Sequence, residues 1–508
     1  MLFRSGQIGT TPGKGSTSNG YSRDANNVLA VGNGVNGAVI IRHAVANANR
    51  TNGATLKVQS GTGVVSIGGN IANLSNLLLD SSSAINLTGA ISGTGALSKL
   101  NANTLTLTGL ANYTGSTEVT AGGIVLTNNV APATSGFTGT GTVVIEPSTS
   151  FTSAVTSAYN FASTLTGLRL GKENNTQSLT ISSAIGIAGP VSLYGAGIAI
   201  NNNIDTRAGG LSGDVLVKSS VDILLAPTKF IKTTGGDVVL WSNSDAQKTD
   251  GTILLSNGSS VATGSGHVWL GGGSGSTSWN GLTVGDGYAV PNTNAINSAS
   301  GALRAGIIFD VSSVQTSGGN IAINAMSGTT TIGAISTHGV NTLDAGNGTI
   351  YIKTRNIDNA GRGLLTGMYN STVAAQTTFK STHAGSDAIV IDVDVSNGLS
   401  TGLGTSVEGN TRILAPNGDI RITSIAATGQ SGLRMGYSST SVGTLQVLSG
   451  SGDILLNTGS TSIETANASS TITLGYVSGD TLVPSSVSNI KFVSDKFSSN
   501  GALVFKRV

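Results

Sequence analysis

Short runs of alternating apolar and polar residues recur along most of the chain. They are rich in Val, Ile, Leu and Thr and are bounded by Gly or Asn, as in residues 104–109, 389–395 and 470–475. Such alternation places successive side chains on opposite faces of a strand, one face inward and the other toward water. Gly interrupts almost every window of ten residues, which disfavours helices. The pattern therefore predicts an all-β protein built from many short strands.

The starts of many of these strands resemble each other. A Gly followed by Asp or Asn precedes three to five strand residues at Gly213, Gly236, Gly319, Gly418 and Gly452. Looser copies begin at Gly251, Gly266 and Gly348. The intervals between consecutive starts are irregular. Such repetition is typical of stacked coils whose turns accept insertions while the strands stay aligned.

Composition separates two architectures that use such strands. A set of β-sandwiches needs linkers and large aromatic core residues, whereas a β-solenoid needs small residues at tight corners and thin aliphatic layers. The 508 residues include 73 Gly but only 10 Phe, 9 Tyr, 3 Trp and 8 Pro, with no break in composition. We therefore expect an elongated parallel β-solenoid with roughly 20 residues per coil.

Charge and cysteine content exclude several functional classes. The chain has no Cys, so it forms no disulfide scaffold and no thiolate metal site. Its net charge of +2 gives no electrostatic footprint for nucleic acid. No segment approaches the roughly 18 consecutive apolar residues of a membrane helix. The four His, at positions 43, 267, 338 and 383, never lie at ligand spacing, and we predict no metal and no cofactor.

Residues 95–126 carry a specific repeat motif. The motif positions are Gly95, Leu97, Lys99, Leu105, Leu107, Gly109, Asn112, Tyr113, Thr114, Gly115, Thr117, Val119 and Gly122. This stretch closely resembles the passenger-associated repeat of bacterial autotransporters, which usually has Gly where this chain has Asn101 and Asn103. The resemblance implies an elongated right-handed parallel β-helix displayed outside a Gram-negative cell, often in adhesion.

A second stretch, residues 235–273, is similar to large filamentous-haemagglutinin-type exoproteins. It combines the strand starts at Gly236, Gly251 and Gly266 with Trp241 and Trp269. We therefore divide the chain into an irregular or edge segment, an autotransporter-repeat-like β-helix and a continuing β-helix with haemagglutinin-like coils and loop insertions. The three segments cover residues 1–50, 51–145 and 146–508, respectively.

The chain starts without the apolar stretch of a signal peptide. Together with the two resemblances, this start leads us to expect a fragment of a longer exported protein, located outside the cell or on its surface. Exposed strand edges at the ends of such a fragment predict end-to-end self-association.

Two glycine-rich motifs have the spacing of catalytic or cofactor sites. Residues 32–37 match GxGxxG, but no acidic residue follows at the distance that a ribose contact needs, since the next one is Asp80. Residues 398–402 match the GxSxG of a nucleophile elbow without the helix that should follow it. In a chain this rich in Gly and Ser, both matches are typical of glycine-rich corners, and we predict no catalytic residue.

Two clusters offer more specific chemistry. Asp392 and Asp394 project from the same face of one predicted strand, as in some polysaccharide-cleaving β-helices, where such a pair acts as acid and base or binds calcium. All three Trp of the chain lie close together in one stretch that ends near Tyr288. If exposed, Trp241, Trp269 and Trp279, with Tyr288, would form a glycan-binding surface; the alternative, which we favour, is that they cover a coil end or pack on a flanking loop.

The leading hypothesis is a non-enzymatic, adhesin-like β-helix on the surface of a bacterium or secreted by it. Such a segment would act as a stiff shaft and as a multivalent binding surface for glycans or for host or neighbouring cells. One alternative is a polysaccharide-cleaving enzyme on the same fold. A second alternative is an ice-binding β-solenoid, because Thr-x-Thr arrays such as residues 104–108 recur.

Overall fold

A computed structural model gives the fold of most of the chain. It describes residues 9–10, 21–23, 28–31, 39–41, 45–46, 55–73, 75–245, 247, 249–294, 296–298, 301–328, 333–356, 361–368, 375–397, 402–436, 441–478, 481–482, 490–494 and 496–499. The chain divides into two compact units. Unit 1 comprises residues 1–196 and 203–213, and unit 2 comprises residues 197–202 and 214–508.

Unit 1 consists of short strands on successive sides of each coil. The first side holds β4 (Val39–Ile41), β7 (Val65–Ile67), β10 (Ile85–Leu87), β13 (Thr104–Leu107), β16 (Gly123–Thr127), β18 (Thr142–Glu146), β21 (Gly167–Leu170) and β24 (Val191–Gly195), with β1 (Gly9–Thr10) antiparallel to β4. The second holds β3 (Val28–Val31), β6 (Thr55–Ser60), β9 (Asn76–Ser81), β12 (Ala96–Lys99), β15 (Thr117–Val119), β17 (Gly136–Gly139) and β20 (Asn160–Phe161), with β2 (Tyr21–Arg23) antiparallel to β3. The third begins as β5 (Val45–Ala46), β8 (Ile71–Ala72), β11 (Ile91–Gly93) and β14 (Ala111–Tyr113). The remaining elements of unit 1 are β19 (Val155–Ser157), β22 (Leu179–Ile181), β23 (Ile185–Gly186), β26 (Ile204–Asp205) and the 3-10 turn η1 (Ala208–Gly210).

Unit 2 repeats the arrangement with longer strands. Its first sheet holds β27 (Val215–Ser219), β30 (Val238–Ser242), β33 (Val268–Trp279), β39 (Ile321–Ser327), β42 (Ile350–Asn356), β45 (Gly385–Asp394), β48 (Gly418–Ile425), β51 (Ile454–Asn457) and β55 (Ile490–Val493), with β34 (Leu282–Gly287) antiparallel to β33. The second holds β25 (Ile198–Ile200), β28 (Ile223–Leu225), β31 (Ile253–Leu255), β37 (Ala305–Asp310), β40 (Gly333–His338), β43 (Arg362–Met368), β46 (Thr405–Val407), β49 (Ser431–Met435), β52 (Ser462–Thr465) and β56 (Lys496–Ser499). The third holds β29 (Phe230–Lys232), β32 (Ser260–Thr263), β38 (Ser313–Thr316), β41 (Val340–Asp344), β44 (Gln376–Lys380), β47 (Asn410–Ala415), β50 (Thr444–Ser449), β53 (Thr471–Ser478) and the antiparallel β54 (Thr481–Leu482). A separate hairpin joins β35 (Ile296–Ser298) and β36 (Gly301–Leu303).

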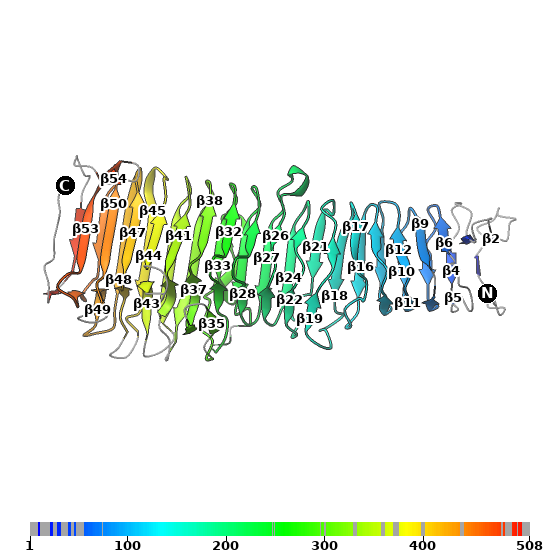
Figure 1. Ribbon diagram of the computed structural model, residues 1–508, viewed down its shortest axis with the longest axis horizontal. Coiled ribbons are helices and arrows are strands. Elements are labelled where there is room, and N and C mark those ends of the chain that lie inside the picture. Colours follow the sequence, from blue (N-terminus) through cyan, green and yellow to red (C-terminus); the bar gives the residue numbers. More distant parts are fainter. Residues whose placement is uncertain are drawn as a thin grey trace. The chain divides into compact units, whose positions relative to one another are not determined.

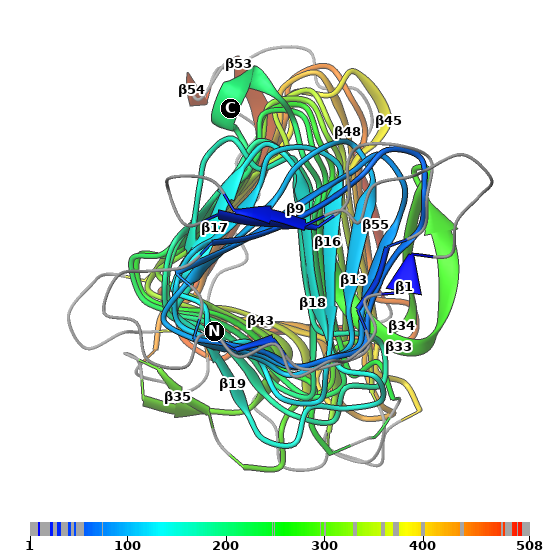
Figure 2. The ribbon, with the colours of Figure 1, turned by 90° about the vertical axis from the view of Figure 1, so that its right-hand side faces the viewer.

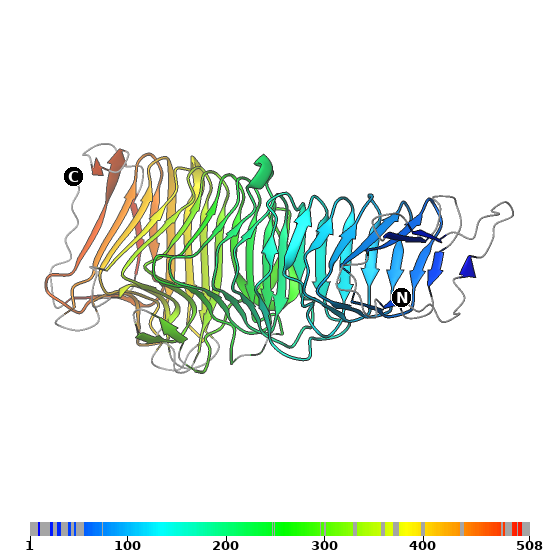
Figure 3. The ribbon, with the colours of Figure 1, turned by 45° about the vertical axis from the view of Figure 1, so that its right-hand side comes forward.

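The predicted all-β parallel β-helix is confirmed within each unit. Seen end-on, the coils of unit 1 have strands on three sides (Figure 2). Strands of successive coils pair in parallel and in register, as Ile85 with Leu105 in unit 1 and Ile321 with Ile350 in unit 2 (Figures 1 and 3). These four side chains are fully buried, so each coil stacks its aliphatic residues directly on those of the next.

Coil length varies within each unit. In unit 1, Val65 pairs with Ile85 and Ile85 pairs with Leu105, a separation that agrees with the expected coil length. In unit 2, Ile321 pairs with Ile350 and Ile350 pairs with Ile389, so these later coils are longer. The predicted segment boundary at residues 145–146 falls inside β18, which pairs with strands on both sides.

The Gly-Asp and Gly-Asn starts mark one corner of the coil in unit 2. Gly236 and Gly319 lie just before β30 and β39, and Gly418 is the first residue of β48. At Gly319, an added Cβ would lie 1.9 Å from the Gly266 carbonyl oxygen, so stacked corners leave no room for a side chain. The residue after each Gly accepts a backbone N–H from the next coil; Asp237 Oδ1, for example, accepts that of His267 at 2.6 Å.

Candidate functional site

The paired tryptophans of unit 2 are buried under a hairpin. Strand β33 continues past its ladder and turns back as β34, covering the outer face of the sheet. Beneath it, Trp241 and Trp269 are 3% and 1% exposed, and their rings pack edge to face at 6.3 Å. Trp241 Nε1 donates a hydrogen bond to the Gly273 carbonyl oxygen at 2.6 Å. These two residues therefore present no ring face to a glycan.

The other two members of the predicted glycan surface are partly exposed. Trp279 lies at the end of β33, with its ring 5.6 Å from that of His267. Tyr288 follows β34, and the Lys353 ammonium lies 5.8 Å from the centre of its ring. The four residues thus gather around one hairpin without forming one open aromatic surface. Sequence reasoning missed the hairpin because residues 271–276 are mostly Gly and Ser and resemble a loop.

The paired carboxylates of β45 each have a separate partner. Arg355, from the preceding coil, forms an ion pair with Asp392 at 2.8 Å. Asp394 Oδ1 accepts hydrogen bonds from the backbone N–H and the hydroxyl of Ser396. No basic residue lies near these carboxylates in the sequence, but parallel register brings Lys353 and Arg355 beside them. The pair is therefore part of a charged surface ladder.

A Ser–His contact that the sequence did not reveal lies on β40. Ser336 Oγ lies 2.6 Å from His338 Nε2, and Asp310 is the register neighbour of His338 on β37. Burial lowers the pKa of His338 to about 4, partly opposed by the Asp310 carboxylate. Each of the three residues is at most 1% exposed, so no substrate reaches the Ser336 hydroxyl. The contact stabilises the packed outer face of the sheet.

Other predicted motifs give no site among the described residues. The GxGxxG motif at residues 32–37, His43 and most of the GxSxG motif at residues 398–402 lie outside them. In the part of the chain that the structure describes, no group of three or more His, Cys, Asp or Glu is placed to hold a metal ion. Within the same ranges, no helix is long and apolar enough to cross a membrane.

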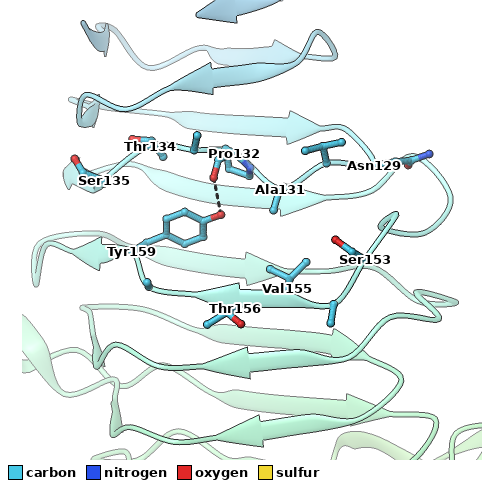
Figure 4. A pocket seen from close by; sticks show the side chains of 13 residues that line it. Asn129, Ala131, Pro132, Thr134, Ser135, Ser153, Val155, Thr156 and Tyr159 are labelled. Carbon is cyan, nitrogen blue, oxygen red and sulfur yellow. Dashed lines mark hydrogen bonds between the residues drawn. The ribbon is translucent and has the colours of Figure 1, made fainter. Parts of the chain in front are cut away.

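One cavity lies on the third side of unit 1, between residues 129–135 and β19. It has a volume of about 500 Å³ and is lined by residues 129–135, 153–156, 158 and 159 (Figure 4). The Tyr159 ring lies between the two segments, and its hydroxyl donates to the Pro132 carbonyl oxygen at 2.9 Å. None of the thirteen lining residues is charged. The pocket is therefore a neutral recess with hydroxyl, amide and small apolar side chains.

A mismatch between two coils produces this pocket. Hydrogen bonds join the coils at both ends, from Thr152 N–H to Asn129 O at 2.8 Å and from Asn160 N–H to Ser135 O at 3.2 Å. The later coil has a longer segment between these bonds than the earlier coil, so the two segments separate between them. Pro132 lies in the shorter segment and has no N–H with which to pair. The ladder is therefore interrupted here.

The pocket wall formed by β19 contains a backbone N–H and a backbone C=O that form no hydrogen bond to another described residue. Val155 N–H bonds to Ser178 O and Ser157 O accepts from Ser182, so both residues face the next coil. Successive residues of a strand direct their backbone N–H and C=O groups to opposite sides. The N–H and C=O of Thr156 therefore face the pocket. Among the described residues, nothing bonds to these two groups. The wall thus offers one donor and one acceptor side by side.

In comparisons with known proteins, no family model matches the chain, and no match was found among the curated proteins or the solved structures.

Proposed function

We propose that this chain is a non-enzymatic, adhesin-like β-helix that acts outside a Gram-negative cell as a stiff spacer and multivalent binding surface. The observation that carries the proposal is the stacking of outward polar side chains. Parallel register places Ser66, Asn86 and Thr106 directly above one another on unit 1. Rows of this kind repeat one contact at the strand spacing of about 4.8 Å. Many weak contacts to a glycan-coated surface then add up to firm attachment.

The likeness of residues 95–126 to the autotransporter repeat supports the surface location. In that stretch Leu97 stacks on Thr117 and Leu105 on Ile124, so the motif spans successive coils of unit 1. Asn101 adopts a left-handed conformation with φ 61°, which Asn tolerates better than most residues other than Gly. This conformation accounts for Asn at position 101, where the repeat usually has Gly. The polysaccharide-cleaving and ice-binding alternatives stay predictions.

A detachment measurement tests the proposal. The 508-residue chain is displayed on a bacterium that does not adhere, and single cells are pulled from a surface coated with neutral glycans. Because contacts are multivalent, we expect the detachment force to rise with the density of displayed chains. Cells that display a globular protein of similar size serve as the control. An unchanged force at every density would contradict the adhesive function.

A further inference from the structure

We propose that the pocket beside β19 binds one neutral sugar unit, entering from solvent as the end of a glycan. This inference deepens the proposed function and rests on it for the source of the sugar. The volume of the pocket, about 500 Å³, lies within the usual range of small-ligand pockets. The proposal assigns a discrete ligand site to unit 1, in addition to the weak contacts along the outer rows.

The lining selects against a charged ligand. None of the thirteen lining residues carries a charge, so a carboxylate, phosphate or ammonium would find no ionic partner in the lining. A hydroxyl needs only hydrogen bonds, which the lining can supply. The Ser153 and Ser135 hydroxyls and the Asn129 amide lie at the rim, while Pro132 and Val155 supply apolar contacts (Figure 4). Alternating polar and apolar surface of this kind matches a sugar ring.

The backbone of Thr156 provides the orienting contacts. Its N–H and C=O project to the same side, toward the pocket, and neither bonds to another described residue. Two neighbouring hydroxyls of a sugar can form hydrogen bonds to this N–H and this C=O, because a hydroxyl can donate and accept. A pocket with one donor and one acceptor beside each other therefore suits a diol better than a purely apolar ligand.

The closed ends of the pocket decide between a sugar and a peptide. An extended peptide would be the usual partner for a free strand edge. Here the hydrogen bonds of Thr152 to Asn129 and of Asn160 to Ser135 join the coils at both ends of the gap. No strand can continue through a gap closed in this way without breaking those bonds. A terminal sugar needs only the open side that faces solvent.

Saturation-transfer NMR on the full chain tests the assignment. The probes are the methyl glycosides of glucose, galactose, mannose and N-acetylglucosamine. Glucuronate and the capped peptide Ac-Ala-Ser-Ala-NH2 are the charged and peptide counterparts. We expect a signal from at least one neutral glycoside and a weaker one from both counterparts. No signal from any of the four glycosides, or a stronger signal from glucuronate or the peptide, would overturn the proposal.

Two substitutions localise the binding. Thr156→Pro removes the N–H that faces the pocket but no ladder bond, and we expect about tenfold weaker binding. The matched control Thr156→Val keeps that N–H and should retain affinity within about twofold. Ala133→Phe fills the pocket and should abolish the signal. This second variant tests the site even if Thr156→Pro folds poorly. An undiminished signal in Ala133→Phe would place the sugar elsewhere.

The outcomes separate this inference from the proposed function. Adhesion that persists when Ala133→Phe loses its sugar signal would leave the pocket as a sugar site that adhesion does not require. A displayed chain that never adheres, yet gives a sugar signal sensitive to Ala133→Phe, would refute the adhesive function and keep the pocket. An unchanged sugar signal in the same variant would refute the pocket alone.

Discussion

Buried polar side chains in both units bond to groups in neighbouring coils. Lys99, fully buried, donates to the Asn101 and Ala121 carbonyl oxygens, the latter at 2.7 Å. In unit 2 the Thr337 and Thr377 hydroxyls lie 2.6 Å apart across the interior. Such bonds make burial of these side chains tolerable, since an unpaired polar group would cost about 1–3 kcal/mol.

The stability of unit 2 should fall in mild acid because of His338. Burial lowers its pKa from 6.5 in the unfolded chain to about 4, so between these values the unfolded state binds more protons. The free energy of unfolding therefore decreases as pH falls through this window, by about 3 kcal/mol from His338 alone. Urea denaturation of the parent and His338→Gln at pH 7, 5.5 and 4 checks this. Equal pH slopes for the two proteins would contradict it.

Lys99 gives unit 1 a pH dependence in the alkaline range. Burial lowers the pKa of its ammonium from 10.5 to about 8. Between these values the unfolded state binds more protons, so we expect the stability of unit 1 to rise with pH from about 8 to 10.5. Lys99→Met removes the titrating group at this position, so the variant should lack the increase in stability that Lys99 contributes. Denaturation monitored at several alkaline pH values measures the difference, and identical curves would refute it.

At the scale of elements, the corner glycines control how closely strands stack. Gly319→Ala would place a methyl group 1.9 Å from the Gly266 carbonyl oxygen, so we expect a loss of about 1–3 kcal/mol. Gly318→Ala is the matched control, because an added Cβ there meets nothing within 4 Å. Urea midpoints of the two variants provide the comparison. Equal stability of both would show that the corner accepts a side chain.

The hairpin of β33 and β34 should act as a cover for the indoles. Replacing residues 274–286 by a short turn keeps the ladder contact of Val268 with Ile321 but uncovers Trp241 and Trp269. We expect a red shift of tryptophan emission and stronger acrylamide quenching. Trp279 is lost in this change, so Trp279→Phe in the intact chain is the control. An emission spectrum that matches this control would mean that the hairpin does not bury the indoles.

The alternation of apolar and polar residues predicted the strands and their aliphatic core, and the repeated Gly-Asp pairs predicted the corners. Both features depend only on residues that are neighbours in the sequence. It did not predict which side chains meet across coils. Arg355 and Asp392 pair because coil lengths set the register, and the sequence alone does not give those lengths. The pocket depends on a small difference in length between adjacent coils, and only Pro132 was a visible signal of it.

At the scale of the whole chain, both units use parallel ladders, and neither keeps one coil length. Ile85 and Leu105 of unit 1 are register partners one short coil apart, whereas Ile321 and Ile350 of unit 2 are separated by a longer coil, and unit 2 also carries the separate hairpin β35–β36. In each unit, backbone bonds between stacked coils support the fold with few aromatic residues. The outer surface is then free to vary, which suits the proposed binding by many contacts.

Residue-resolved hydrogen exchange on the full chain tests this account most directly. We predict the slowest amides in β10, β13 and β16 of unit 1 and in β39, β42 and β45 of unit 2. The Thr156 N–H should exchange fast beside the slow Val155, and should slow when the glycoside that binds is added. Fast exchange throughout these strands would contradict the parallel β-helix. A Thr156 amide as slow as Val155 in the free chain would contradict the open edge that forms the pocket.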